Sequence, residues 1–388
     1  MMMRLSVCFL AVFVAVTCKA QDYNITFVPD SLRKGADVVK REEEFILTIK
    51  SAAKYVLYEK HSYTILNAAA GKYANYVTHY DKFCAINSVS GKLFNPMGKQ
   101  IKHSKKSDWN DNSAYDGFSL LSDARYKENE FYVAEYPYTV EYEEEDEVNG
   151  IQAFPTWMPQ REPSMSVQHS KFTIIAPADY IVRYKQVNFT GVPLITQKGD
   201  LKTYTWELKN IVAKKRELSA PSFNEITPTV FFAPSKFEVQ GYKGDMSSWE
   251  AYGAFMYQLI RGRDVLPVEI KKKVHALTDN IATDKEKIFL LYDFLQKNTR
   301  YVSIQLGIGG WQPFEASFVA EKKYGDCKAL SNYMIALLKE AGIKGKYVEI
   351  YGGNHPPPFI EDFSFSQANH VISCVPLDKD TIWLECTS

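Results

Sequence analysis

Two patterns of hydrophobic and polar residues divide the chain. From Glu44 to about Gln240, short runs rich in β-branched and aromatic residues alternate with turn residues, which predicts an all-β region. Runs of this kind include residues 131–136, 138–142, 171–175 and 204–208. From Ser247 the spacing changes to the three-to-four-residue period of amphipathic helices. We therefore expect an α+β fold in which an all-β sandwich over residues 21–240 precedes a mixed domain over residues 247–388.

Amphipathic helices are expected in the first part of the second domain. Trp249 to Ile260 carry one apolar stripe, Val268 to Leu277 carry a second, and a capping box that begins at Thr283 introduces a third. A strand over residues 301–306 and a glycine-rich loop over residues 307–311 follow. Because this loop lacks the Gly-Lys-Ser/Thr sequence of phosphate-binding loops, we interpret it as a turn and not as a nucleotide site.

The most informative amphipathic pattern lies between Gly325 and Gly342. Apolar residues recur there at helical spacing, at positions 330, 333, 334, 337, 338 and 341. Asp326 is in place to cap the start of this helix, and Gly342 is in place for the left-handed residue that ends it. Cys327 therefore falls in the first turn, where free N–H groups and the helix dipole favour a thiolate. We interpret Cys327 as a candidate nucleophile, with a structural cysteine as the alternative.

A cysteine nucleophile needs a base and a group that orients the base. Of the seven histidines, only His370 begins a clear strand downstream of the Cys327 helix. If the chain forms a hairpin about residues 376–380, Glu385 comes to the same face of the sheet as His370. A carboxylate there can accept a hydrogen bond from the imidazole Nδ1–H and direct Nε2 toward the thiol.

The first 20 residues have the pattern of a secretory signal peptide. Arg4 supplies a positive charge, residues 5–17 are almost wholly apolar, and Ala20 ends the segment with a small side chain. The apolar stretch is shorter than the ~20 residues that a bilayer-spanning helix needs, so no stable membrane span is expected. We expect an exported protein, periplasmic or extracellular. A lipoprotein anchored at Cys18 is the alternative, and Thr17 before it disfavours that interpretation.

Cysteine usage fits export without requiring disulfides. Four of the six cysteines lie beyond the expected cleavage site, and none of them forms a Cys-x-x-Cys pair or has the spacing of zinc ligands. We interpret Cys84 as a buried small hydrophobe. The hairpin register places Cys374 and Cys386 on opposite faces of the sheet, which disfavours a bridge between them.

Charge excludes one class of function. Acidic and basic residues balance at 46 each, which argues against a nucleic-acid binder. The densest charge is the run from Glu143 to Glu147, just before Asn149-Gly150. We interpret this run as the solvated end of a hairpin and not as a cation site. Nothing in the sequence requires a metal or an organic cofactor, and the oligomeric state is left open.

Several stretches of the second domain resemble a bacterial transglutaminase-like domain, a family similar in fold to papain-type thiol proteases. The stretches are residues 300–304 and 309–313, Tyr324-Gly325-Asp326-Cys327-Lys328, Asn369-His370-Val371 and Trp383-Leu384-Glu385. The resemblance implies that Cys327, His370 and Glu385 form a catalytic triad. Through residues 206–210 and 232–234, the β region resembles the domain of unknown function that commonly precedes such domains in exported bacterial proteins.

Two positions depart from the pattern of this family. Glu385 stands where the family more usually has Asp, and Ala329 stands where an Asp is often found two residues after the cysteine. Because Glu is one methylene longer than Asp, its strand must lie slightly further from His370. Members of the family usually continue past this acid, so the resemblance implies a domain that is cut short at Ser388.

These features favour a thiol acyl-transfer enzyme that acts on peptide or amide carbonyls of a protein or peptide substrate. Cys327 would attack the carbonyl, His370 would move the proton, and Glu385 would orient His370. The Cys327 backbone N–H would supply one oxyanion donor, and the second is unidentified. An amine acceptor gives crosslinking, and water gives deamidation or peptide hydrolysis. The alternative is a catalytically degenerate exported protein that binds or assembles partners through its β-sandwich.

Overall fold

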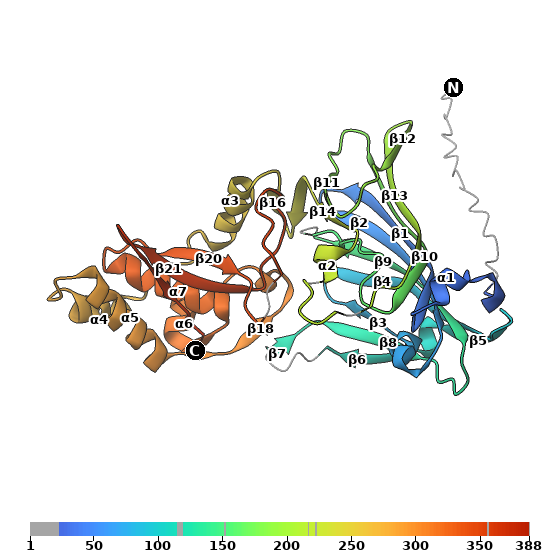
Figure 1. Ribbon diagram of the computed structural model, residues 1–388. Coiled ribbons are helices and arrows are strands. Elements are labelled where there is room, and N and C mark those ends of the chain that lie inside the picture. The colour runs from blue at the N-terminus through green and yellow to red at the C-terminus, as the bar shows by residue number, and fades with distance from the viewer. Residues whose placement is uncertain are drawn as a thin grey trace, which may run out of the picture.

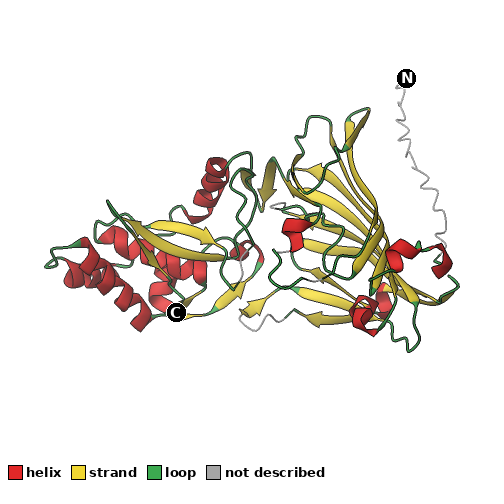
Figure 2. Cartoon of the chain, viewed as in Figure 1, coloured by secondary structure: helices red, strands yellow, loops and turns green. Residues whose placement is uncertain are grey.

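A β-rich N-terminal body and a mixed C-terminal body lie side by side in the computed structural model of the chain (Figure 1). The structure describes residues 23–114, 119–150, 153–215, 217–221, 223–354 and 357–387. The expected α+β class, with a β-rich region ahead of the helical one, is confirmed (Figure 2). The signal peptide expected over residues 1–20 lies outside the described residues. Within them, no helix is both long and apolar enough to cross a membrane.

One eight-stranded sheet dominates the N-terminal body. In spatial order its strands are β12 (Leu194–Lys198), β13 (Leu201–Ile211), β10 (Met165–Pro177), β1 (Val38–Ser51), β2 (Lys54–Ile65), β9 (Tyr138–Asn149), β4 (Cys84–Phe94) and β5 (Gln100–Lys105). Neighbouring strands pair antiparallel except for β1 and β10, which are parallel. The strands predicted over residues 138–142, 171–175 and 204–208 are confirmed. The strand predicted over residues 131–136 is wrong, since β8 ends at Glu130 and residues 131–136 form the connection to β9, in which Phe131 packs against Tyr142.

Smaller sheets cover one face of this large sheet. They pair β11 (Arg183–Val187) with β14 (Thr229–Ala233), β15 (Lys236–Val239) with β16 (Tyr242–Asp245), and β8 (Arg125–Glu130) with both β3 (Asn75–Tyr80) and β6 (Asn110–Ser113). Phe172 of β10 stacks on Phe232 of β14 with ring centroids 4.5 Å apart, and Tyr142 of β9 stacks on Tyr76 of β3 at 4.8 Å. Such aromatic pairs contribute about 0.5–1.5 kcal/mol each beyond their buried area. The expected sandwich thus has one large layer and one composite layer.

The acidic run Glu143–Glu147 is not the solvated hairpin end that the sequence suggested. It lies within β9, between β2 and β4 in the middle of the large sheet, and Glu144 is buried. Lys92 on β4 binds Glu143 at 2.9 Å, so cross-strand ion pairs offset part of the charge. Burial and the neighbouring Glu144 carboxyl raise the pKa of Asp146 to about 9. The residues that compensate these charges come from other strands. The local sequence does not contain them, and for this reason it predicted a solvated hairpin end.

The C-terminal body packs helices against a three-stranded sheet. The helices are α3 (Trp249–Ile260), α4 (Val268–Thr278), α5 (Asp284–Asn298), α6 (Ala316–Lys322) and α7 (Cys327–Glu340), and the sheet order is β20 (Lys346–Ile350), β21 (His370–Pro376) and β22 (Thr381–Leu384). The helices predicted from Trp249, Val268 and Thr283 are confirmed, whereas α6 was not predicted. The strand expected over residues 301–306 is split into β17 (Arg300–Tyr301) and β18 (Ser303–Gln305).

Helix α7 is the centre of the C-terminal core. Its predicted apolar stripe is confirmed, since the stripe residues from Leu330 to Leu338 are at most 1% exposed. Each such side chain contributes roughly 1.5–3 kcal/mol relative to an exposed one. Gly342 follows with φ of +78°, as expected of the residue that ends a helix. The stripe therefore fixes how α7 rotates against β21 and where its first residue, Cys327, lies.

Candidate active site

Cys327 occupies the first turn of α7, as the sequence predicted. Asp326 caps the helix, because its Oδ1 accepts a hydrogen bond of 2.9 Å from the Ala329 N–H. Asp326 also forms an ion pair with Lys328, and Gln305 on β18 lies 3.4 Å from both charged groups. Cys327 thus begins a helix in which Asp326, Lys328 and Gln305 of β18 contact one another. Cys327 itself is 8% exposed.

The protonation of Cys327 differs from the sequence-based expectation. Burial raises the pKa of the Cys327 thiol, and the Asp326 carboxylate adds to that effect. Lys328 and the N–H groups of Val371 and Lys328 act in the opposite direction, but they do not outweigh burial. The position at a helix start alone favours a thiolate, whereas burial shifts the pKa of the thiol in the opposite direction.

His370 and Glu385 lie on the same face of the sheet, as the hairpin register predicted. The pairing of β21 with β22 sets Ser373 opposite Leu384, and this register brings the two functional side chains to one side. His370 Nε2 lies 2.8 Å from Glu385 Oε2. The nitrogen that meets the acid is therefore Nε2, and not the Nδ1 that was expected from the sequence.

Hydrogen bonds hold this pair in place. Burial alone would raise the pKa of the Glu385 carboxyl, but hydrogen bonds from Thr387 and His370 hold it below its ordinary value. Thr387 donates to Glu385 Oε1 through its hydroxyl at 2.6 Å and its N–H at 3.0 Å. Beside His370, the Asn369 side chain bonds the backbone of Gly352 at both its N–H and its carbonyl. The acid is thus ionised and both ends of the pair are anchored.

A cavity of about 370 Å³ brings these residues together. Cys327 and His370 both line it, and Glu385 lies behind His370 in the hydrogen bond described above. Further lining residues come from other elements: Tyr252, Gln305, Trp311, Lys328 and Glu349. Sequence reasoning did not single out Tyr252 or Glu349, because one belongs to a stripe typical of core packing and the other lies on a short strand without a motif. Only the tertiary fold shows that they line the same cavity as Cys327.

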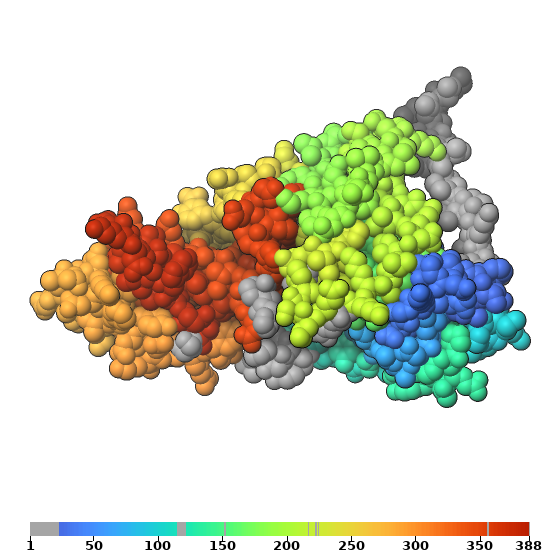
Figure 3. All heavy atoms as spheres, viewed as in Figure 1, coloured from blue at the N-terminus to red at the C-terminus, as the bar shows by residue number. Residues whose placement is uncertain are grey.

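The N-terminal body supports one wall of this cavity. Strand β18, which carries Gln305, pairs in parallel with β7 (Ser119–Ser122) of the N-terminal body. Phe83, the residue before β4, packs against Trp311 with ring centroids 5.4 Å apart. In Figure 3 the two bodies are in close contact. The β domain therefore positions residues that line the cavity.

Three cysteines of the described residues lie outside this cavity. Cys84, Cys374 and Cys386 are free thiols, and the hairpin register predicted from the sequence disfavours a bridge between Cys374 and Cys386. Cys84 is only half-buried, and its thiol lies 3.8 Å from an oxygen of Asp146. Cys84 is therefore less buried and more polar in its surroundings than the interpretation as a core hydrophobe implied.

Comparisons with known proteins agree with this arrangement. A family model described as "Domain of Unknown Function with solved-structure structure (DUF3857)" matches residues 52–215. A second, described as "Transglutaminase-like superfamily", matches residues 271–387 and so includes Cys327, His370 and Glu385. A search of curated protein sequences found no match.

Among solved structures, the chain is similar to a "putative protease" from Parabacteroides distasonis, with 16% identity and a TM-score of 0.68 over 90% of this chain and 67% of that one. This likeness shows the fold alone. A "putative cysteine protease" from Cytophaga hutchinsonii has 11% identity and a TM-score of 0.25 over 87% of this chain and 78% of that one. An M1 zinc metallopeptidase from Deinococcus radiodurans has 9% identity and a TM-score of 0.26 over 58% and 53%. TM-scores of 0.25 and 0.26 do not establish a shared fold, so nothing further is inferred from these two structures. Residues 52–215 are therefore similar to DUF3857 domains, and residues 271–387, which follow them, are similar to domains of the transglutaminase-like superfamily.

Proposed function

We propose that this chain is a thiol acyl-transfer enzyme in which Cys327 is the nucleophile, His370 the general base and acid, and Glu385 the group that orients His370. The observation that carries this proposal is the 2.8 Å contact between His370 Nε2 and Glu385 Oε2 at the edge of a cavity that Cys327 also lines. A nucleophile, a base and an orienting acid in that order are the elements that acyl transfer through a thiol requires.

The raised pKa of Cys327 favours general-base activation over a preformed ion pair. His370 takes the thiol proton as the Cys327 sulfur bonds to the carbonyl carbon of a peptide or amide. The C–N bond then breaks, the imidazolium returns its proton to the leaving amine, and a thioester remains. Water or a second amine attacks the thioester and frees the thiol. Glu385 stays ionised throughout and stabilises the imidazolium.

The acceptor distinguishes three outcomes: crosslinking with an amine, deamidation of a glutamine side chain with water, and hydrolysis of a backbone peptide bond with water. The substrate in all three is a protein or peptide. Export to the periplasm or the cell exterior belongs to the proposal and is supported by the pattern of residues 1–20.

A second candidate function is that of an exported binding or assembly protein without catalysis. The burial of Cys327 and the raised pKa of its thiol favour this alternative, because they make the thiol a poor nucleophile without help from His370. The two candidates differ in whether a thioester forms.

Trapping an acyl group on Cys327 tests the proposal. The full chain is mixed with peptide p-nitrophenyl esters and short glutamine-containing peptides, and the products are examined by intact-mass spectrometry after rapid acid quench. We expect a thioester adduct on the native protein, none on Cys327→Ala, and an undiminished adduct on the control Cys84→Ser. An adduct that His370→Ala forms as fast as the native protein would contradict the assigned base.

A further inference from the structure

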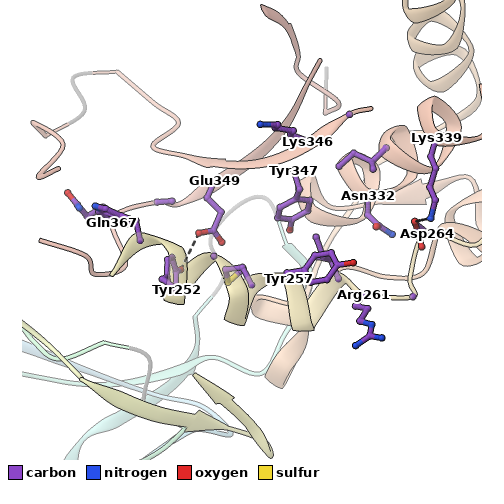
Figure 4. Close-up of a pocket in the computed structure, with 18 of the residues that line it drawn as sticks. Tyr252, Tyr257, Arg261, Asp264, Asn332, Lys339, Lys346, Tyr347, Glu349 and Gln367 are labelled. Carbon is purple, nitrogen blue, oxygen red and sulfur yellow. Dashed lines mark hydrogen bonds and ion pairs between the residues drawn. The ribbon is translucent and has the colours of Figure 1, made fainter. Parts of the chain in front are cut away.

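A second cavity of about 830 Å³ opens beside the catalytic cleft. It lies between α3 on one side and α7 and β20 on the other (Figure 4). Tyr252, Glu349 and Ala368 line both cavities, so the two cavities adjoin. A peptide held at Cys327 can therefore extend into this second cavity, which we call the side chamber.

The side chamber has the composition of a ligand pocket. Its volume falls within the ~300–1,000 Å³ typical of such sites, which are mostly apolar with a few polar groups. Aromatic side chains reach it from three elements: Trp249, Tyr252, Tyr257, Tyr347, Phe359 and Phe365. Figure 4 shows Tyr252 and Tyr257 on α3 across the chamber from Tyr347 and Glu349 on β20. A pocket lined by aromatic side chains favours an apolar or a cationic guest.

Glu349 is the charged group at the junction of the two cavities. The Tyr252 hydroxyl donates to its Oε2 at 3.1 Å, but among the described residues no cation forms an ion pair with it. Lys328 is close enough to affect Glu349, yet its ammonium pairs with Asp326. Burial raises the pKa of the Glu349 carboxyl, as expected of an acid that lacks a compensating charge.

A second polar group in the chamber, the Tyr347 hydroxyl, lacks a hydrogen-bond partner among the described residues. The Tyr347 hydroxyl is buried, and no hydrogen bond to it exists within the described part of the chain. Buried polar groups are usually satisfied by protein, water or a ligand. Glu349, which accepts one hydrogen bond but has no ion-pair partner among the described residues, and the unpaired Tyr347 hydroxyl lie on the same strand and point to a guest that brings hydrogen-bond donors.

We propose that the side chamber binds the part of a peptide substrate that carries a positively charged amino group on an apolar body. The ammonium would lie at Glu349 and donate to its carboxylate, and the apolar body would pack on the aromatic rings. The amino group belongs either to the side chain of a lysine or to the free N-terminus of the peptide. This inference rests on the proposed function for the position of the peptide, but the binding itself does not need the thiol.

Binding to the full chain carrying Cys327→Ala tests the inference without catalysis. Three probes separate the sources of the amino group: acetyl-Ala-Ala-Lys-Gly-Gly-amide has only the lysine, Ala-Ala-norleucine-Gly-Gly-amide has only the α-amine, and the acetylated norleucine peptide has neither. Titration calorimetry gives their dissociation constants. We expect one charged probe to bind at least about tenfold more tightly than the uncharged probe. Whichever charged probe binds more tightly identifies the source.

Variants locate the interaction. Glu349→Gln in the Cys327→Ala background should reduce the preference for the charged probe to less than about threefold, whereas Glu321→Gln, an exposed acid on α6, should leave it unchanged. If Glu349→Gln fails to fold, Tyr252→Phe, which removes only the hydroxyl that holds Glu349, should weaken the same preference. The inference would be overturned if all three probes bound equally, or if none of them bound. It would also be overturned if Glu349→Gln weakened the binding of charged and uncharged probes by the same factor. Glu349-dependent binding without a thioester on the native protein would support the chamber and refute the proposed reaction.

Discussion

Arg183 on β11 joins the N-terminal domain to the segment that leads into His370, and its removal tests whether the domains act together. Arg183 Nη1 donates to the Ser364 carbonyl at 2.9 Å, and Nη2 donates to the Ser364 hydroxyl at 3.0 Å. Its guanidinium carbon also lies 4.8 Å from the centroid of the Phe363 ring. Hydrogen bonds from a charged donor contribute ~1.5–3 kcal/mol and a cation–π contact ~0.5–2 kcal/mol. Because Arg183 is only half-buried and water recovers part of this energy, we expect Arg183→Ala to cost about 2 kcal/mol.

Native-state hydrogen exchange followed by mass spectrometry measures this loss directly. A cost of about 2 kcal/mol corresponds to roughly 30-fold faster exchange in peptides that cover residues 357–369, if this segment opens locally. The rate of thioester formation should fall as well, because His370 follows the loosened segment. Arg125→Ala, which removes an ion pair with Asp111 on the other side of the N-terminal domain, is the control. Unchanged exchange over residues 357–369, or equally faster exchange over the whole chain, would refute the reasoning.

Three further predictions concern protonation and the triad. The alkylation rate of Cys327 by iodoacetamide should rise with a midpoint above ~8.5, the ordinary thiol pKa, because burial raises the pKa of its thiol; Cys84, whose pKa is raised to about 12, should react more slowly still. Glu385→Gln should slow thioester formation about 5- to 30-fold, the loss that 1–2 kcal/mol of charge-assisted hydrogen bonding gives, while circular dichroism stays unchanged. Asp146 has a pKa of about 9 in the folded chain, so its folded form holds a proton that the unfolded form releases near 4. Asp146 therefore makes stability fall as pH rises between these values, and Asp146→Asn should raise the melting temperature more at pH 8 than at pH 5.

Local patterns in the sequence were enough to single out the residues of the proposed triad. The apolar stripe of α7 has helical period, its cap lies one residue before Cys327, and a glycine follows its end. These are short-range signals, since each depends on residues within one or two turns. The face shared by His370 and Glu385 followed from the length of a hairpin turn, because the side chains of a strand alternate with period two. The sequence therefore determined which residues can meet, and in what order.

Only the tertiary structure decided the state and the surroundings of those residues. Burial by distant segments raises the pKa of Cys327 against the effect of the helix dipole, and lysines from neighbouring strands allow the run Glu143–Glu147 to lie inside a sheet. The side chamber and the contact of Phe83 with Trp311 likewise join segments far apart in the chain. Desolvation and charge compensation depend on neighbours in three dimensions. They therefore produce no repeating pattern of residues that could be recognised in the sequence. For this reason the sequence determined the candidate chemistry, whereas the fold determined how that chemistry is tuned and what can reach it.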